Sequence, residues 1–281
     1  MAIKTEVVDR VPTYPGRVKM TPVSGQTNVY DMTRMDSPIT VGTPINKALF
    51  DQKAYTLTDN VTVYVSASGS DVTGEGTSVA PYATIQKAVN SIPKCLGGYH
   101  AQIDIAAGTY EERVTIDGFY GGRLTIGVAD RQVTVRGVSV LSSECVRLNI
   151  THMTHSAAFT GNLLFVDYGS NVTLLQPLTF RGENADISGI AVSRGGFVSS
   201  PVTVAFLDFA GPAINATSGA KIALAALNGN SNNTGYGVQC QAGALVTYSS
   251  RALVTTKGDY TGSGGRILTA GGTTMANASV V

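Results

Sequence analysis

The chain has 281 residues, of which 14% are charged, and its formal net charge is +1. So small a net charge gives no electrostatic basis for binding nucleic acid or an anionic membrane, and a hydrophobic content of 43% excludes a disordered chain. Thr, Val and Gly are abundant and Trp is absent, which favours short strands joined by turns over helical bundles, so we expect an all-β protein.

Residues 1–55 form the first segment and contain five of the ten Pro residues. Closely spaced Pro excludes long helices and central strands. We expect an extended arm with short strands, such as one at residues 17–20, and a helical turn near residues 46–52. Such a segment buries too little apolar surface to fold alone, so we expect it to become ordered against a neighbouring molecule. A floppy tail is the alternative.

From residue 61 onward, apolar residues recur at the spacings typical of strands and helices. Residues 61–65 alternate as a strand, and a loop rich in Gly, Ser and Thr follows. Apolar spacing then predicts a helix over residues 85–92, capped by Thr84 and stopped by Pro93. This helix would cover the first rung of the β structure that follows it. Short alternating strands are predicted at residues 103–105, 114–116, 124–126 and 133–135.

A repeat occupies the C-terminal half of the chain. Gly169, Gly195, Gly219 and Gly243 follow one another at spacings of 26, 24 and 24 residues. When the chain is aligned on these glycines, three columns are apolar. They are Leu164, Ile190, Ile214 and Val238; Val166, Val192, Ala216 and Cys240; and Val172, Val198, Ile222 and Val246.

A period of about 24 residues built from short strands predicts a parallel β-helix. Aligned residues would stack on the next rung about 4.8 Å away, and the apolar columns would form a continuous core. The recurrent Gly would supply a turn with positive φ. We expect six or seven rungs between residues 100 and 257, within a β-helix domain at residues 56–257. Residues 258–281 would form a C-terminal cap or tail.

Catalysis of glycoside cleavage on this scaffold would need a pair of carboxylates. Acidic residues are scarce in the repeat, and the candidates are Glu183, Asp186 and Asp208. Glu183 and Asp186 share one turn, where hydrogen bonding within a solvated loop is the other interpretation.

The sequence contains few His and Cys residues that could bind a metal or form a disulfide. His152 and His155 are the only His pair, whereas a metal site needs three or four ligands. We therefore expect these two residues to be polar residues of a rung turn. A metal shared across a symmetry axis is the alternative. No cofactor is expected. Cys95, Cys145 and Cys240 are expected to be buried free thiols of a protein made in a reducing cytoplasm, with a disulfide or metal role as the alternative.

Tyr and Arg residues near the C-terminal end offer a contact surface. Tyr236, Tyr248, Arg251 and Tyr260 gather there, and aromatic faces and Arg are favoured in binding surfaces. Tyr248 also extends an aligned rung, so a place in the core is the alternative for it.

Two motifs resemble a known β-helix family. Residues 81–88 (PYATIQKA) and 108–116 (GTYEERVTI) resemble the capping helix and first strand of pectate-lyase-like proteins. The resemblance implies a right-handed, single-stranded parallel β-helix with an N-terminal capping α-helix. It implies no particular reaction.

A second resemblance lies in the arm. Residues 11–51, including VPTYPGRVKMTPVSGQTNVYDMTR and GTPINKALFD, resemble the N-terminus of tail proteins of phages and prophages of Gram-positive gut bacteria. The resemblance implies a tailspike-like virion protein, made in the bacterial cytoplasm, that assembles as a homotrimer and attaches to other tail or baseplate proteins through residues 1–55. No nucleic acid or membrane insertion is expected.

Together these features predict a structural tail spike that binds a host-surface polysaccharide without covalent chemistry. A polysaccharide depolymerase of the tailspike type, either a glycoside hydrolase or a lyase, is the first alternative, and a purely structural baseplate or head-decoration protein is the second. Charged residues fall from 26 in the first 140 positions to 13 in the last 141. We interpret this weakly charged lateral surface as one that contacts other copies of the chain.

Overall fold

The computed structural model describes residues 11–12, 18–25, 29–34, 38–40, 56–230 and 232–269. The chain divides into two compact units, Met1–Ala54 and Tyr55–Val281. In the described part of the chain, no helix combines the length and the apolar character needed to cross a membrane.

The first unit contains short antiparallel strands. One pair is β1 (Val11–Pro12) with β4 (Pro38–Thr40), and the other is the hairpin of β2 (Val18–Pro22) with β3 (Tyr30–Arg34). The strand expected at residues 17–20 overlaps β2, whereas the helical turn expected at 46–52 lies outside the described residues. Met20 is paired with Met32 across the hairpin, and the two are 57% and 71% exposed. This hairpin therefore presents apolar side chains to its surroundings.

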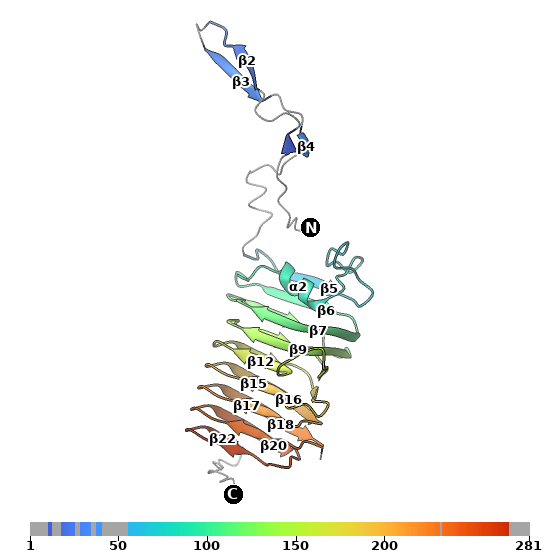
Figure 1. Ribbon diagram of the computed structural model, residues 1–281, viewed down its shortest axis with the longest axis vertical. Helices are drawn as coiled ribbons and strands as arrows, with labels where there is room; N and C mark the ends of the chain where they lie inside the picture. Colours follow the sequence, from blue (N-terminus) through green and yellow to red (C-terminus); the bar gives the residue numbers. More distant parts are fainter. Residues whose placement is uncertain are drawn as a thin grey trace. The chain divides into compact units, whose positions relative to one another are not determined.

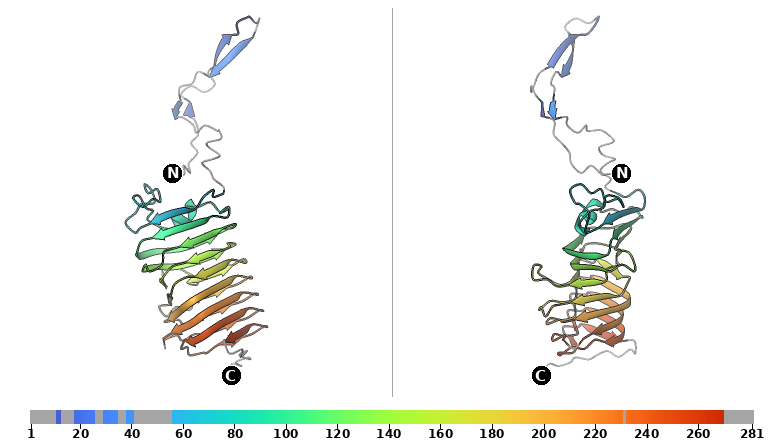
Figure 2. Two further views of the ribbon diagram at one scale, coloured as in Figure 1. Left: turned by 180° about the vertical axis from the view of Figure 1, so that it is seen from behind. Right: turned by 90° about the vertical axis from the view of Figure 1, so that its right-hand side faces the viewer.

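The second unit is a parallel β-solenoid of about seven turns, which confirms the predicted fold class (Figure 1). Figure 2 shows strands of successive turns lying side by side when the stack is seen from behind and from the side. The strands form three faces. The first face comprises β5 (Val61–Val65), β6 (His100–Ile105), β8 (Arg123–Ile126), β10 (Val146–Leu148), β13 (Asn171–Leu174), the first parts of β16 (Phe197–Leu207), β18 (Lys221–Gly229) and β20 (Leu245–Ala252), and β22 (Arg266–Thr269).

The other two faces complete each turn. The second comprises the start of β7 (Gly108–Asp117) and of β9 (Val133–Leu141), β11 (His152–Thr154), β14 (Leu178–Arg181) and the ends of β16, β18 and β20. The third comprises the ends of β7 and β9, β12 (Leu164–Asp167), β15 (Ile190–Val192), β17 (Ile214–Ala216), β19 (Val238–Cys240) and β21 (Tyr260–Thr261).

The core consists of side chains stacked in columns through the solenoid. The three apolar columns predicted from the repeat are confirmed, because each aligned residue pairs with the next in strand register and is buried. A further column on the second face runs through Tyr110, Val135, Met153, Phe180 and Phe206. The rings of Phe180 and Phe206 stack with their centroids 5.2 Å apart. Each fully buried side chain of this size contributes about 1.5–3 kcal/mol to stability.

The recurrent glycines lie at the turns between the third and first faces, as predicted. Their φ angles are 70°, 76°, 74° and 74°, and the residue before each also has positive φ. Two successive positive φ values are the geometry of a type I′ turn. A fifth copy of the turn occurs at Ser263 and Gly264, with φ of 49° and 79°. It was not predicted, because it follows Gly243 by only 21 residues.

Helix α2 (Ile85–Ser91) covers the N-terminal end of the solenoid, where it packs against β5, β6 and β7 (Figure 1). The predicted cap is confirmed, since Thr84 Oγ1 accepts a hydrogen bond from the Lys87 N–H at 3.2 Å. The predicted apolar face is also buried. The helix ends one residue earlier than predicted, because Ile92, the residue before Pro93, is extended.

The C-terminal end differs from the prediction. Strands β21 and β22 pair in parallel with β19 and β20, so the solenoid continues beyond residue 257 into the segment expected to form a cap. Ile267 of β22 is fully buried and adds a member to the first-face column. The tail from residue 270 onward lies outside the described residues.

The cysteines are all free, but only one has the predicted environment. Cys240 is buried in a core column, Cys95 is half-buried, and Cys145 is exposed. The expectation of burial is wrong for Cys145 because it occupies a turn with φ of 51°, before β10 begins.

Candidate functional site

Two of the predicted contact residues lie together on the solenoid surface. The rings of Tyr236 and Tyr260 are 5.7 Å apart between centroids, and Lys257 Nζ lies 5.4 Å from the centre of the Tyr236 ring. Tyr260 continues an outward column that includes Asn215 and Gln239 on the preceding rungs. We call these five residues the tyrosine strip. Aromatic faces, amides and a cation together can stack on sugar rings and hydrogen-bond their hydroxyls.

The other two predicted contact residues are turned toward the interior, although the Arg251 side chain remains 21% exposed. Tyr248 is only 5% exposed, and Arg251 lies in an interior column next to Leu227. Both contact Asp259, with Arg251 Nη1 at 2.5 Å and the Tyr248 hydroxyl at 3.4 Å from Oδ2. The other carboxylate oxygen accepts the Val238 N–H at 2.9 Å. These contacts hold the segment that leads into β21, the strand that begins with Tyr260.

Burial dominates the electrostatics of this internal cluster. It raises the pKa of Asp259 above its usual value, and the opposing effect of Arg251 is smaller. Burial likewise raises the pKa of Tyr248. Among the described residues, Arg251 Nε is a buried nitrogen without a hydrogen-bond partner. The cluster is therefore a costly internal ion pair rather than a contact surface.

Both carboxylate oxygens of Asp208, one of the catalytic candidates, accept hydrogen bonds from neighbouring side chains. Its carboxylate accepts hydrogen bonds from Asn230 at 2.9 Å and Asn232 at 3.0 Å, and Arg181 Nη1 lies 2.6 Å from Oδ2. The amide donors, followed by Arg181, hold the pKa of Asp208 below its usual value. Such a carboxylate stays ionised and is a poor general acid.

Glu183 and Asp186, the other two candidates, are both exposed on one loop. Glu183 Oε1 lies 3.9 Å from Arg181 Nε, so the structure brings Glu183 and Asp208 to the same guanidinium group. A glycosidase needs one carboxyl group with a raised pKa beside an ionised one. Arg181 instead lies between the two carboxylates, and the pKa of Asp208 is lowered.

Asp167 is a fully buried carboxylate that sequence reasoning did not single out. It accepts hydrogen bonds from Ser193 Oγ and Arg194 Nε, each at 2.8 Å. The Arg194 guanidinium also stacks on the ring of Tyr168, 3.8 Å from its centroid. The available signal was an Asp followed by an Arg one rung later, at the repeated turn.

The His pair is not part of a metal site in the described part of the chain, where no three His, Cys, Asp or Glu residues are grouped to hold an ion. His152 lies on β11 between Thr134 and Thr179 of the flanking strands, and its Nδ1 lies 3.1 Å from Thr151 Oγ1. His155 follows the strand and donates its backbone N–H to Arg181.

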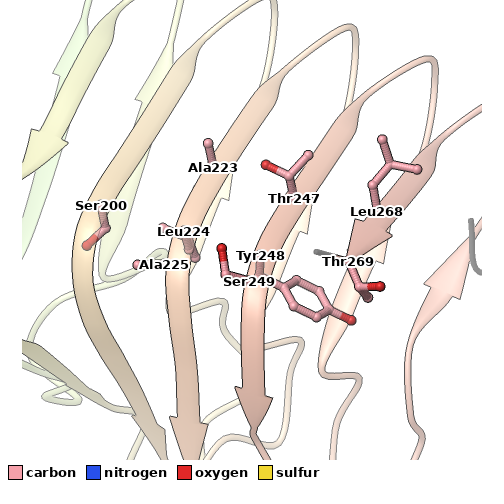
Figure 3. Close-up of a pocket in the computed structure, with 9 residues that line it drawn as sticks. All are labelled: Ser200, Ala223, Leu224, Ala225, Thr247, Tyr248, Ser249, Leu268 and Thr269. Carbon is pink, nitrogen blue, oxygen red and sulfur yellow. The ribbon is translucent and has the colours of Figure 1, made fainter. Parts of the chain in front are cut away.

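A groove of about 460 Å³ crosses β16, β18, β20 and β22 where the first face meets the second (Figure 3). Ala223 and Ala225, two small residues of β18, are among the residues that line it. Sequence reasoning missed this groove, because its lining comes from four strands that are far apart in the sequence. Its lining is uncharged: Ser200, Ala223, Leu224, Ala225, Thr247, Tyr248, Ser249, Leu268 and Thr269.

A comparison of the chain with protein-family models, with curated proteins and with solved structures finds no significant match in any of the three.

Proposed function

We propose that this protein is a non-catalytic phage tail spike that binds a polysaccharide on the host surface. The observation that carries the proposal is the tyrosine strip, in which Tyr236 and Tyr260 present adjacent rings on a stiff solenoid. Asn215 and Gln239 precede Tyr260 in its outward column, and Lys257 Nζ lies 5.4 Å from the centre of the Tyr236 ring. Sugar binding uses this combination of an aromatic platform and hydrogen-bonding groups.

Residues 1–55 would attach the spike to the tail or baseplate. The exposed pair Met20 and Met32 supports this role, because flexible Met side chains suit an interface that is buried on assembly. The charge-poor lateral surface supports assembly as a homotrimer. Three copies would give avidity, so a shallow contact at each strip would suffice.

Adhesion is favoured over cleavage by the environment of the candidate carboxylates. Asp208 and Glu183 are both held near Arg181, and Asp208 has a lowered pKa. The proton-donating carboxyl group that a glycosidase requires needs the opposite environment.

The test is a competition assay in which purified protein is added to susceptible bacteria before the phage. Wild-type protein should reduce phage adsorption, and the double variant Tyr236→Ala/Tyr260→Ala should not. Tyr99→Ala is the matched control, since Tyr99 is 39% exposed near the other end of the solenoid. Loss of competition in the control alone, or full competition by the double variant, would contradict the proposal.

Assembly is tested separately. Light scattering should give three times the chain mass of 29.2 kDa, and a monomer would remove the trimer from the proposal. Deletion of residues 1–55 should leave a folded solenoid that no longer joins the particle. Failure of the deleted form to fold would refute the role of the arm as an attachment segment.

A further inference from the structure

The groove of Figure 3 has two cations beside it that the tyrosine strip does not use. Its floor includes the outward residues Ala223 of β18 and Leu268 of β22. Lys221 and Arg266 precede these residues by two positions on the same strands and point to the same side of the sheet. Residues two apart on a strand are separated by about 6.6 Å. Both side chains are therefore long enough to reach a group held in the groove.

Lys221 and Arg266 are exposed, and no described residue forms an ion pair with either of them. The four strands that form the groove contain no Asp or Glu. Arg251, also near this end, is by contrast paired with Asp259. The groove thus lies next to positive charge that no acidic residue of the described part of the chain neutralises.

The uncharged floor and the two cations would contact different parts of the same ligand. Ala223, Thr247 and Leu268 lie in one outward column and offer small apolar and hydroxyl groups, which suit the face of a sugar ring. Lys221 and Arg266 lie two rungs apart, at about 10 Å, on either side of Leu245. They suit a carboxylate carried by the ring itself.

We propose that this groove binds a uronic acid residue of an acidic host polysaccharide. The inference rests on the proposed adhesive function and adds the chemical class of the glycan and a second contact surface. Arg147 and Arg123, further along the same face, are also outside the ion pairs of the described residues. A polymer that runs along the solenoid would therefore meet further cations.

The test uses the full-length protein on an array of defined oligosaccharides. The array holds oligogalacturonate, oligoguluronate, oligomannuronate and hyaluronan fragments, the carboxyl-reduced form of each, neutral glucans, poly(glycerol phosphate) and single-stranded DNA. We expect binding to at least one uronate, about tenfold or more weaker for its carboxyl-reduced form and weakened by salt. Lys221→Gln/Arg266→Gln should reduce uronate binding by a similar factor, and Lys87→Gln, an exposed charge on α2, should not.

A second variant tests the groove without changing the charge. Ala223→Phe fills the floor from the outer side of the sheet, so it should abolish uronate binding while the melting temperature stays near that of the wild type. The inference is overturned if no uronate binds, if the charge variant binds uronates as well as wild type does, or if poly(glycerol phosphate) or DNA binds equally well. Neutral-glycan binding that depends on Tyr236 and Tyr260 would preserve the proposed function alone. An array with no bound glycan would overturn both.

Discussion

The carboxylate of Glu112, on β7, accepts a hydrogen bond from the backbone N–H of Ile85, the first residue of α2, at 2.7 Å. Its second oxygen accepts the Gln86 N–H at 2.9 Å. The Gln86 side chain in turn binds β7, where it accepts the Thr115 N–H at 2.7 Å and donates to the Thr115 carbonyl at 3.1 Å. Two side chains thus satisfy the backbone groups that join the capping helix to the first complete turn.

Glu112→Ala should therefore destabilise the solenoid. Two N–H groups at the helix start would lose their acceptor, at a cost of about 1–3 kcal/mol. Thermal unfolding should show a lower melting temperature. Glu111→Ala is the matched control in the same strand, because the Glu111 side chain is 63% exposed and its ion pair with Arg136 lies at the surface. Equal shifts for the two variants would show that Glu112 has no special role.

The ion pair of Asp167 with Arg194 predicts a pH dependence of stability. The N–H groups of Arg194 hold the pKa of Asp167 below its usual value of 3.8, against the effect of burial. A lowered folded-state pKa gives stability that is present above the unfolded pKa and lost as the pH falls through the folded one. The difference in melting temperature between wild type and Asp167→Asn should thus be largest at neutral pH and shrink below about pH 4.

The control for this prediction is Asp186→Asn, which changes an exposed residue of a loop. It should leave the melting temperature close to that of the wild type at each pH. A difference between wild type and Asp167→Asn that stays constant from pH 7 to pH 3 would contradict the assigned role of Arg194.

The repeated turn predicts a specific order among substitutions at Gly219. Its φ is 74°, and a Cβ added there would meet no atom within 4 Å, so the backbone angle alone limits the choice of residue. Gly219→Ala should cost about 1–2 kcal/mol, the usual penalty of the left-handed region. Gly219→Asn should cost less, because Asn tolerates that region better. Urea unfolding of both variants checks the order, and its reversal would show that something other than φ selects Gly.

The repeat made the core of the later rungs predictable from the sequence. Residues such as Ile190 and Val238 recur at nearly constant spacing, and constant spacing in sequence becomes vertical stacking in a solenoid. The repeat predicted no turns or columns in the rungs whose loop lengths differ. The turn at Gly264 was missed because the last rung is shorter than the others. The column through Phe180 was missed because its members lie on rungs of unequal length.

The candidate site was less predictable because charge alone does not show which way a side chain points. Arg251 was expected at the surface, yet the register of β18 with β20 places it in the interior column that contains Leu227. The sequence places Tyr236 and Tyr260 only in the same C-terminal region, and their ring contact depends on two separate rungs. The groove depends on four strands, and no local pattern reports such a feature.

The environment of Asp208 predicts that the protein releases no new reducing ends from host capsule or wall polysaccharide. Its carboxylate is paired with Arg181 and remains ionised, so the acid required for glycosidic cleavage is missing from this cluster. A reducing-end assay on wild type, Asp208→Asn and Glu183→Gln checks this. Turnover by wild type that either substitution abolishes would establish the depolymerase alternative.

The buried pair of Arg251 and Asp259 gives the last prediction. Arg251→Leu would continue the apolar column but leave Asp259 as an unpaired buried carboxylate, at a cost of about 3–5 kcal/mol. Arg251→Leu/Asp259→Asn should recover much of that loss, because the amide oxygen can still accept the Val238 N–H.

The single variant should also respond to pH in a defined direction. Burial already raises the pKa of Asp259, and removal of Arg251 would raise it further. A raised folded-state pKa gives stability that is present at low pH and lost as the pH rises through that value. The melting temperature of Arg251→Leu should therefore increase, relative to the double variant, as the pH falls from about 8 to about 4, the ordinary pKa of an Asp. If the two variants keep a constant difference over that range, Asp259 is not the group whose burial Arg251 compensates.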